Sequence, residues 1–293
     1  MKTAQAGILA AIPSHARYLT FALKQGTRPH AELKFLAAVA DGKACVVGIG
    51  ALLAFALQQE IDGLKPFPHY RGHGVEVPST PAALWCWLRG EDRGEIVLRS
   101  HAIEKLLAPA FEVAGSVDAF KYGRGLDLTG YEDGTENPKG KKAVTAAIVN
   151  DKRPGVGGAS FVAVQQWVHD LDRFAAMPHK QQDDSIGRRK RDNKELGSAP
   201  ASAHVKRTAQ ESFAPEAFVW RRSMPWADAK QAGLMFVAFG KSLDAFDAQL
   251  RRMAGAEDGT VDALFTFTRP VTGAYYWCPP VKGRRLDLRA IGL

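Results

Sequence analysis

The order of predicted strands and helices is the feature that most constrains the fold. In the first half of the chain, short runs rich in β-branched and aromatic residues predict strands, and apolar residues at steps of three and four predict helices. The resulting order is β-α-β-β-α-β, which is typical of a ferredoxin-like unit. The predicted strands are 16–23, 45–49, 83–88 and 111–120, and the predicted helices are 30–40 and 95–108.

The second half predicts the same order around a long polar insertion at 178–207. We therefore expect an α+β fold of tandem ferredoxin-like domains with packed antiparallel sheets, of the dimeric α+β barrel type. Residues 1–145 are expected to form the N-terminal domain and residues 146–293 the C-terminal one. The strands predicted here are 160–167, 218–222, 234–239 and 261–268, and the helices are 168–177 and the segment between Ser242 and Gly255.

Composition limits the classes of protein that the chain can belong to. A hydrophobic content of 46% and a charged content of 24% are typical of a soluble globular protein. The net charge of +8 comes without a zinc-finger or RNA-binding signature, so we expect no specific nucleic-acid partner. Three scattered cysteines favour reduced thiols in a cytoplasmic protein, and no apolar run reaches the roughly 18 residues of a membrane span.

A polar loop at 130–138 is the first candidate for chemistry. Within nine residues it contains two glycines, three carboxylates, an Asn and a Pro. A carboxylate such as Asp133 on a rigid loop can take part in catalysis, because scaffolds fix functional loops. The same residues also suit an ordinary polar turn, so the loop alone does not decide between the two interpretations.

Among eight histidines, none has the spacing of a zinc site. His204 differs by its context, because it precedes a predicted strand that carries Arg221.

Four motifs follow one another along the chain: Gly130-x-x-Asp133-Gly134 with Thr135 to Pro138, Ile186-Gly187-Arg188, Ser202-x-His204 and Arg221-x-Ser223. Together these motifs resemble the dye-decolorizing peroxidases, and most closely the bacterial class B members. The resemblance covers nearly the whole chain and implies two ferredoxin-like domains, with haem b (iron protoporphyrin IX) held mainly by the second. It also implies a peroxidase that is oxidised by hydrogen peroxide to a ferryl intermediate and then oxidises phenolic or dye-like aromatic donors.

The resemblance assigns a residue to the proximal side of the haem. His204 matches the metal ligand, whose imidazole would bind the haem iron through one ring nitrogen. A carboxylate that accepts the other N–H would fix the tautomer. Asp262 is the first candidate for that carboxylate and Glu216 the second.

On the distal side, Asp133 matches the acid–base residue and Arg221 the cation that stabilises developing charge. Ser223 lies two residues further along the same predicted strand, so it is expected on the same face as Arg221, where it could bind a distal water. Gly134 belongs to the same motif and is expected next to the cofactor.

Further residues are candidates for contacts with the cofactor. Arg188 is the first candidate to pair with a haem propionate, and Arg207 is the second. Met235, Val237 and Phe239 share one face of a predicted strand, and could either line the haem pocket or belong to the core.

The resemblance also suggests partners and rivals for this function. A homo-oligomer is expected. Some relatives enter encapsulin shells through a C-terminal tag, and residues 286–293 do not decide whether this chain has such a tag. Two alternatives remain: a porphyrin-modifying or iron-releasing enzyme, and a haem carrier or sensor in which Asp133 and Arg221 would be dispensable.

Overall fold

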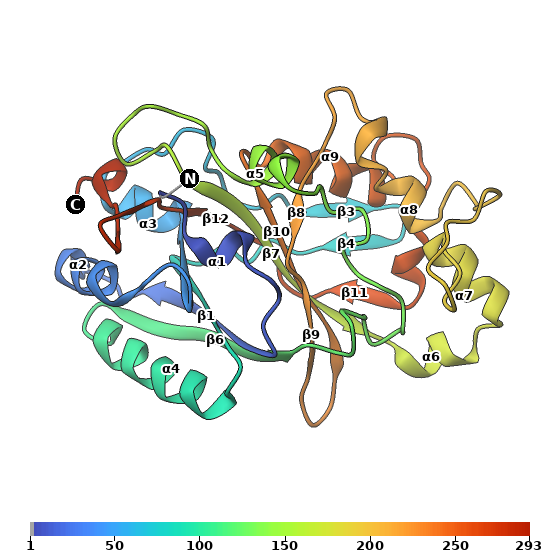
Figure 1. Cartoon of the computed structure of the whole chain (residues 1–293), viewed down its shortest axis with the longest axis horizontal. Coiled ribbons are helices and arrows are strands. Elements are labelled where there is room, and N and C mark those ends of the chain that lie inside the picture. The colour runs from blue at the N-terminus through green and yellow to red at the C-terminus, as the bar shows by residue number, and fades with distance from the viewer. Residues whose placement is uncertain (1–2) are drawn as a thin grey trace.

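Strands from both halves of the chain join into one closed sheet in the computed structural model, which describes residues 3–293 (Figure 1). Each half forms its own four-stranded antiparallel sheet with ferredoxin-like order, which confirms the predicted fold class.

In the N-terminal half the sheet order is β2-β5-β1-β6, and α2 and α4 pack together against it (Figure 1). The predicted strand at 111–120 matches the observed β6, and the other predicted elements agree to within a few residues. The elements are β1 (His15–Leu23), α2 (His30–Val39), β2 (Cys45–Gly50), β5 (Leu84–Gly90), α4 (Arg93–Leu107) and β6 (Phe111–Phe120), with α1 (Ala6–Leu9), α3 (Ala51–Ala56), β3 (Tyr70–Gly72) and β4 (Val75–Val77) added.

The C-terminal half repeats the order as β12-β7-β10-β9. Its elements are β7 (Ser160–His169), β9 (Met224–Ala227), β10 (Ala232–Gly240), α9 (Asp244–Met253) and β12 (Ala274–Cys278), with α5 (Lys141–Ala147), β8 (Trp220–Arg221), β11 (Thr268–Pro270), β13 (Val281–Lys282), β14 (Arg285–Leu286) and the 3₁₀ helix η3 (Arg289–Ile291) added.

Three predictions for this half were wrong in position. The fourth strand is β12, whereas 261–268 forms the 3₁₀ helix η2 (Ala263–Thr266), because the side chain of Asp262 caps it by accepting a hydrogen bond from the Leu264 N–H. The predicted helix at 168–177 is shorter, because β7 continues to His169. The predicted strand at 218–222 contains only the two residues of β8.

The insertion between β7 and β9 contains short helices that lie at one end of the molecule (Figure 1). They are α6 (Leu171–Ala176), α7 (His179–Ile186), α8 (His204–Arg207) and the 3₁₀ helix η1 (Gln210–Ser212).

The two sheets close into a barrel through pairs at both edges. Tyr276 of β12 pairs with Gly50 of β2, and Ala119 of β6 pairs with Trp226 of β9. Buried aromatic side chains, among them Trp85 and Trp87, fill the interior. Because the halves share one sheet, the domain boundary at residue 145 stays a prediction.

Within residues 3–293 there is no helix with the length and apolar character needed to cross a membrane.

Candidate functional site

A cavity lies outside the barrel, between the outer face of the C-terminal sheet and the helices that cover it. Strand side chains alternate, so Gln165 and Trp167 of β7 and Leu234 and Phe236 of β10 face outward into it. We call this the inner cavity. Its other walls are residues from the loop at 127–133, from α8 and its end, from α9, and from the segment at 264–268, namely Asp127, Asp133, His204, Thr208, Phe246, Gln249, Leu250, Met253, Leu264, Phe267 and Thr268.

His204 is the first residue of α8 and its imidazole lines the inner cavity. Its Nδ1 lies 2.8 Å from Oδ2 of Asp262, whose side chain is fully buried. Because the other carboxylate oxygen accepts the Leu264 N–H at 2.9 Å, Asp262 is held in one orientation. The carboxylate therefore fixes the proton of His204 on Nδ1 and leaves Nε2 as the nitrogen with a free lone pair.

Asp133 and Arg221 line the same cavity from the polar loop and from β8. Arg221 Nη1 lies 3.8 Å from Asp133 Oδ1, and the two side chains are 13% and 20% exposed. This distance exceeds a hydrogen bond and allows a small molecule to reach both groups. The cavity thus contains an imidazole, a carboxylate and a guanidinium.

Carboxamide side chains hold the loop at 130–138 in place. Asn137 Oδ1 accepts the Arg221 N–H at 2.8 Å, and Asn137 Nδ2 donates to the Arg221 carbonyl at 3.1 Å. Gln210 donates to the Glu136 carbonyl at 2.7 Å, and Asn193 donates to the Glu132 carboxylate at 2.8 Å and to the Thr135 hydroxyl at 2.9 Å.

A second cavity adjoins the first and shares His204, Asp133 and Arg221 with it. We call it the outer cavity. It is lined by the cations Arg188 and Lys206 and also by the carboxylates of Glu132, Glu136, Glu195 and Glu211. Lys206 lies 3.3 Å from the Glu195 carboxylate. Arg188 is buried and already paired with the carboxylates of Glu136 and Glu195.

The residues present fit a haem group. The inner cavity offers an imidazole with a free Nε2 and largely apolar walls, and the outer cavity offers cations for carboxylates. Gln165 is 1% exposed, lines the inner cavity, and its Nε2 has no hydrogen-bond partner among residues 3–293. Buried polar atoms normally have partners, so this atom indicates that the cavity is built for an occupant.

Residues 124–283 match the family model described as Dyp-type peroxidase, C-terminal. A dye-decolorizing peroxidase of Rhodococcus erythropolis is 32% identical over 251 residues, which cover 82% of this chain and 73% of that protein. The chain belongs to the Dyp-type peroxidase family. A second dye-decolorizing peroxidase, from Mycolicibacterium paratuberculosis, is 30% identical over 224 residues and is covered to 63% of its length, with 74% of this chain aligned.

Solved structures resemble this peroxidase over almost its whole length. The dye-decolorizing protein of V. cholerae superposes with a TM-score of 0.85 at 27% identity, covering 98% of both chains. A variant of Rhodococcus jostii DypB, solved in complex with haem, gives a TM-score of 0.86 at 25% identity and covers 94% of this chain and 96% of that one. The predictions of the peroxidase family, of peroxidase activity and of haem as its cofactor are confirmed.

Of the two positions left open for Met235, Val237 and Phe239, the structure supports the core of the peroxidase. Met235, Val237 and Phe239 are 4%, 0% and 0% exposed and point into the barrel, next to aromatic residues such as Trp87. Their neighbours Leu234 and Phe236 line the inner cavity instead. Both faces of β10 are apolar, so the alternation of the sequence could not distinguish them.

Four further candidates line neither cavity of the peroxidase, and one of them is Gly134, which lies between Asp133 and Thr135. Ser223 is buried, and its hydroxyl lies 3.4 Å from the Val237 N–H rather than in a cavity. Arg207 forms two hydrogen bonds of 2.8 Å with Asp258. Glu216 is exposed and lines a separate surface hollow, so Asp262 is the partner of His204.

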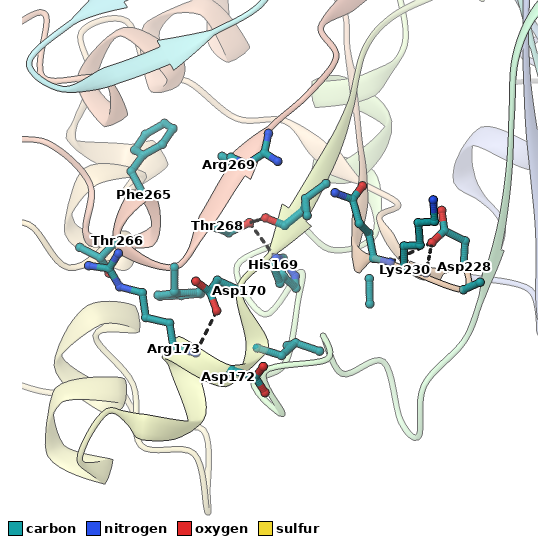
Figure 2. Close-up of a pocket in the computed structure, with 16 residues that line it drawn as sticks. His169, Asp170, Asp172, Arg173, Asp228, Lys230, Phe265, Thr266, Thr268 and Arg269 are labelled. Carbon is teal, nitrogen blue, oxygen red and sulfur yellow. Dashed lines mark hydrogen bonds between the residues drawn. The ribbon is translucent and has the colours of Figure 1, made fainter.

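His169 of the peroxidase separates the inner cavity from an open surface hollow (Figure 2). Its two ring nitrogens lie 2.7 Å from the Thr268 hydroxyl and 2.9 Å from the Asp127 carboxylate. Burial alone would raise the pKa of Asp127, but the hydrogen bonds from His169 and Thr129 lower it, so this carboxylate stays ionised beside the cavity.

Several site residues of the peroxidase were not found from the sequence. Lys206, Asn193 and Gln210 lie in or beside the cavities without a motif that marks them, and the sequence assigned no role to Gln165. Asn137 belongs to the polar loop, but nothing in the sequence showed that it contacts Arg221.

Proposed function

We propose that this peroxidase binds haem b in the inner cavity, with His204 Nε2 as the iron ligand. One observation carries the proposal: a histidine with a buried carboxylate partner lines the same cavity as an aspartate and an arginine. When bound, the haem would supply the iron that takes up the oxidising equivalents of hydrogen peroxide.

Asp262 would act through His204. By accepting the Nδ1–H, it would keep the lone pair on Nε2 and raise the electron density that the imidazole gives to its ligand bond.

Asp133 would move the proton on the distal side. As a carboxylate it would accept a proton from one peroxide oxygen and return it to the other, so that water leaves. Arg221 would stabilise the negative charge that develops on the departing oxygen, because its guanidinium is a permanent cation. Their separation of 3.8 Å would allow both groups to reach the same peroxide.

Arg188 and Lys206 would pair with the haem propionates in the outer cavity. Arg207 is not proposed for this role, because it lines neither cavity.

The test is the rate at which the haem-loaded protein reacts with hydrogen peroxide, measured by stopped-flow absorption. We expect Asp133→Ala and Arg221→Ala each to slow this reaction about 100-fold or more. Arg17→Ala is the matched control, because Arg17 also pairs with an aspartate, Asp118 at 2.6 Å, and lines neither cavity.

Unchanged rates in both variants would contradict the distal roles of Asp133 and Arg221, whereas a haem-loaded wild-type protein inert to peroxide would favour a carrier or sensor. Loss of iron or of the porphyrin during turnover would favour a porphyrin-modifying enzyme instead.

Hydrogen peroxide and a reducing substrate are the partners that membership of the peroxidase family implies. We propose that the donor is phenolic or dye-like and that the protein is cytoplasmic. We also propose that it is a homo-oligomer, and light scattering would test the number of subunits. A related peroxidase from Mycobacterium smegmatis is described as encapsulated. A shell-docking tag has less support here, because Leu288 and Ile291 are buried in the core.

A further inference from the structure

The loop that carries Asp133 and the strand that carries Arg221 are joined in an unusual way. Among residues 3–293, no backbone-to-backbone hydrogen bond links residues 130–138 to residues 217–223. The hydrogen bonds between these two segments run through carboxamide side chains instead. The relative position of the two proposed distal residues therefore depends on side chains rather than on a β ladder.

Asn137 makes the most direct of these links. Its carboxamide accepts from the N–H and donates to the carbonyl of Arg221, which is the pattern that a neighbouring strand would provide. The Arg221 N–H has Asn137 Oδ1 as its acceptor, whereas the Arg221 carbonyl also accepts from Arg222 Nη1 at 3.1 Å. The two bonds to Asn137 define which carboxamide atom is oxygen and which is nitrogen.

The loop brings Asn137 to this position by a tight turn. The Asn137 N–H donates to the Gly134 carbonyl at 3.0 Å, and Gly134 has a φ of +74°, which favours glycine. A Cβ at Gly134 would lie 2.7 Å from Asn137 Nδ2. Asp133 is thus the residue immediately before a turn whose end is fixed to Arg221.

We propose that Asn137 is a positioning residue that holds the Arg221 guanidinium against the Asp133 carboxylate. This inference rests on the distal roles proposed above. Asn137 lines neither cavity, so it would act through Arg221 and would not touch peroxide itself.

The experiment measures the reaction of the haem-loaded enzyme with hydrogen peroxide in Asn137→Ala, Arg221→Ala and the double variant. Small displacements of catalytic groups have large effects on rate, so we expect N137A to slow the reaction about 10- to 100-fold. In the R221A background the same change should have no more than about a twofold effect, because its action passes through Arg221.

Gln182→Ala is the matched control. Like Asn137, Gln182 ties two chain segments through its carboxamide: it is buried and donates to the backbone carbonyls of Phe174 and Met177, at 2.9 and 3.0 Å, but it lines neither cavity. It should lower the melting temperature as N137A does and leave the peroxide rate unchanged.

Cyanide affinity of the ferric enzyme supplies a readout other than turnover. Cyanide bound on the distal side would take hydrogen bonds from Arg221, so N137A should weaken its binding by about tenfold and Q182A should not. Asn137→Asp keeps the acceptor for the Arg221 N–H and loses the donor, and should give intermediate values if N137A does not fold.

Either of two results would overturn the inference: a wild-type peroxide rate in N137A while R221A is slow, or an N137A effect of the same size in the R221A background. The first result leaves the proposed function standing. A wild-type rate in R221A overturns the distal role of Arg221 and this inference together.

Discussion

The buried carboxylate of Asp262 controls which nitrogen of His204 is available. Asp262 accepts from His204 Nδ1 and from the Leu264 N–H, and it is shielded from water. An ionised carboxylate without such partners would be costly to bury, so the two hydrogen bonds account for its place in the structure.

Asp262→Asn is expected to weaken haem binding about 10- to 100-fold. The new carboxamide can still accept the Leu264 N–H with its oxygen, but it then presents an N–H to His204 Nδ1. The imidazole proton would move to Nε2, which would lose the lone pair proposed to bind iron. Titration of the haem-free protein, followed in the Soret band, measures the affinity.

Asp258→Asn is the control for this change. Asp258 pairs with Arg207 at the surface, next to the same helix α8. Asp258→Asn should therefore leave the haem affinity at the wild-type value. Equal haem affinities for D262N and the wild type would contradict the proximal role of Asp262.

At the scale of elements, one face of strand β10 packs in the barrel core and the other lines the inner cavity. Met235, Val237 and Phe239 pack inside the barrel, and Leu234 and Phe236 line the inner cavity. Met235→Ala should therefore lower the free energy of unfolding by about 2–5 kcal/mol, as for other buried methionines. Phe236→Ala should instead weaken haem binding, by about tenfold.

Chemical denaturation of the haem-free protein and haem titration separate the two effects. The assignment of faces is wrong if M235A weakens haem binding more than F236A does.

The sequence predicted the order of elements well and the details around the site less well. The motif residues His204, Asp133 and Arg221 line one cavity, as expected from the family resemblance that assigned them to one site. The face of β10 that lines the cavity was not predictable, since both of its faces are apolar. The segment at 261–268 read as a strand because it is apolar, and the capping bond of Asp262 that makes it helical depends on tertiary position.

At the scale of the whole molecule, the closed barrel links the two ferredoxin-like halves. The contacts that close it join residues more than 100 positions apart, such as Gly50 with Tyr276 and Ala119 with Trp226. No local pattern encodes such pairs, so the sequence indicated packed sheets without showing that their edges join. One consequence is that the site, which lies outside the C-terminal sheet, depends on strands from the N-terminal half.

The seam at Gly50 offers a test of that dependence. A Cβ on residue 50 would lie 1.9 Å from the backbone oxygen of Ala82. Because both atoms belong to or sit directly on the backbone, only a backbone movement could relieve this clash. Gly50→Ala should therefore displace the end of β2, where Gly50 pairs with Tyr276 of β12, and lower the free energy of unfolding by about 1–3 kcal/mol or more. Because the barrel joins both halves, we expect a single unfolding transition at lower denaturant in which tryptophan fluorescence and haem release change together.

Gly72→Ala is the matched control, since a Cβ there meets open space. Two separate transitions in Gly50→Ala, with haem retained through the first, would show that the C-terminal half keeps its site without the closed barrel.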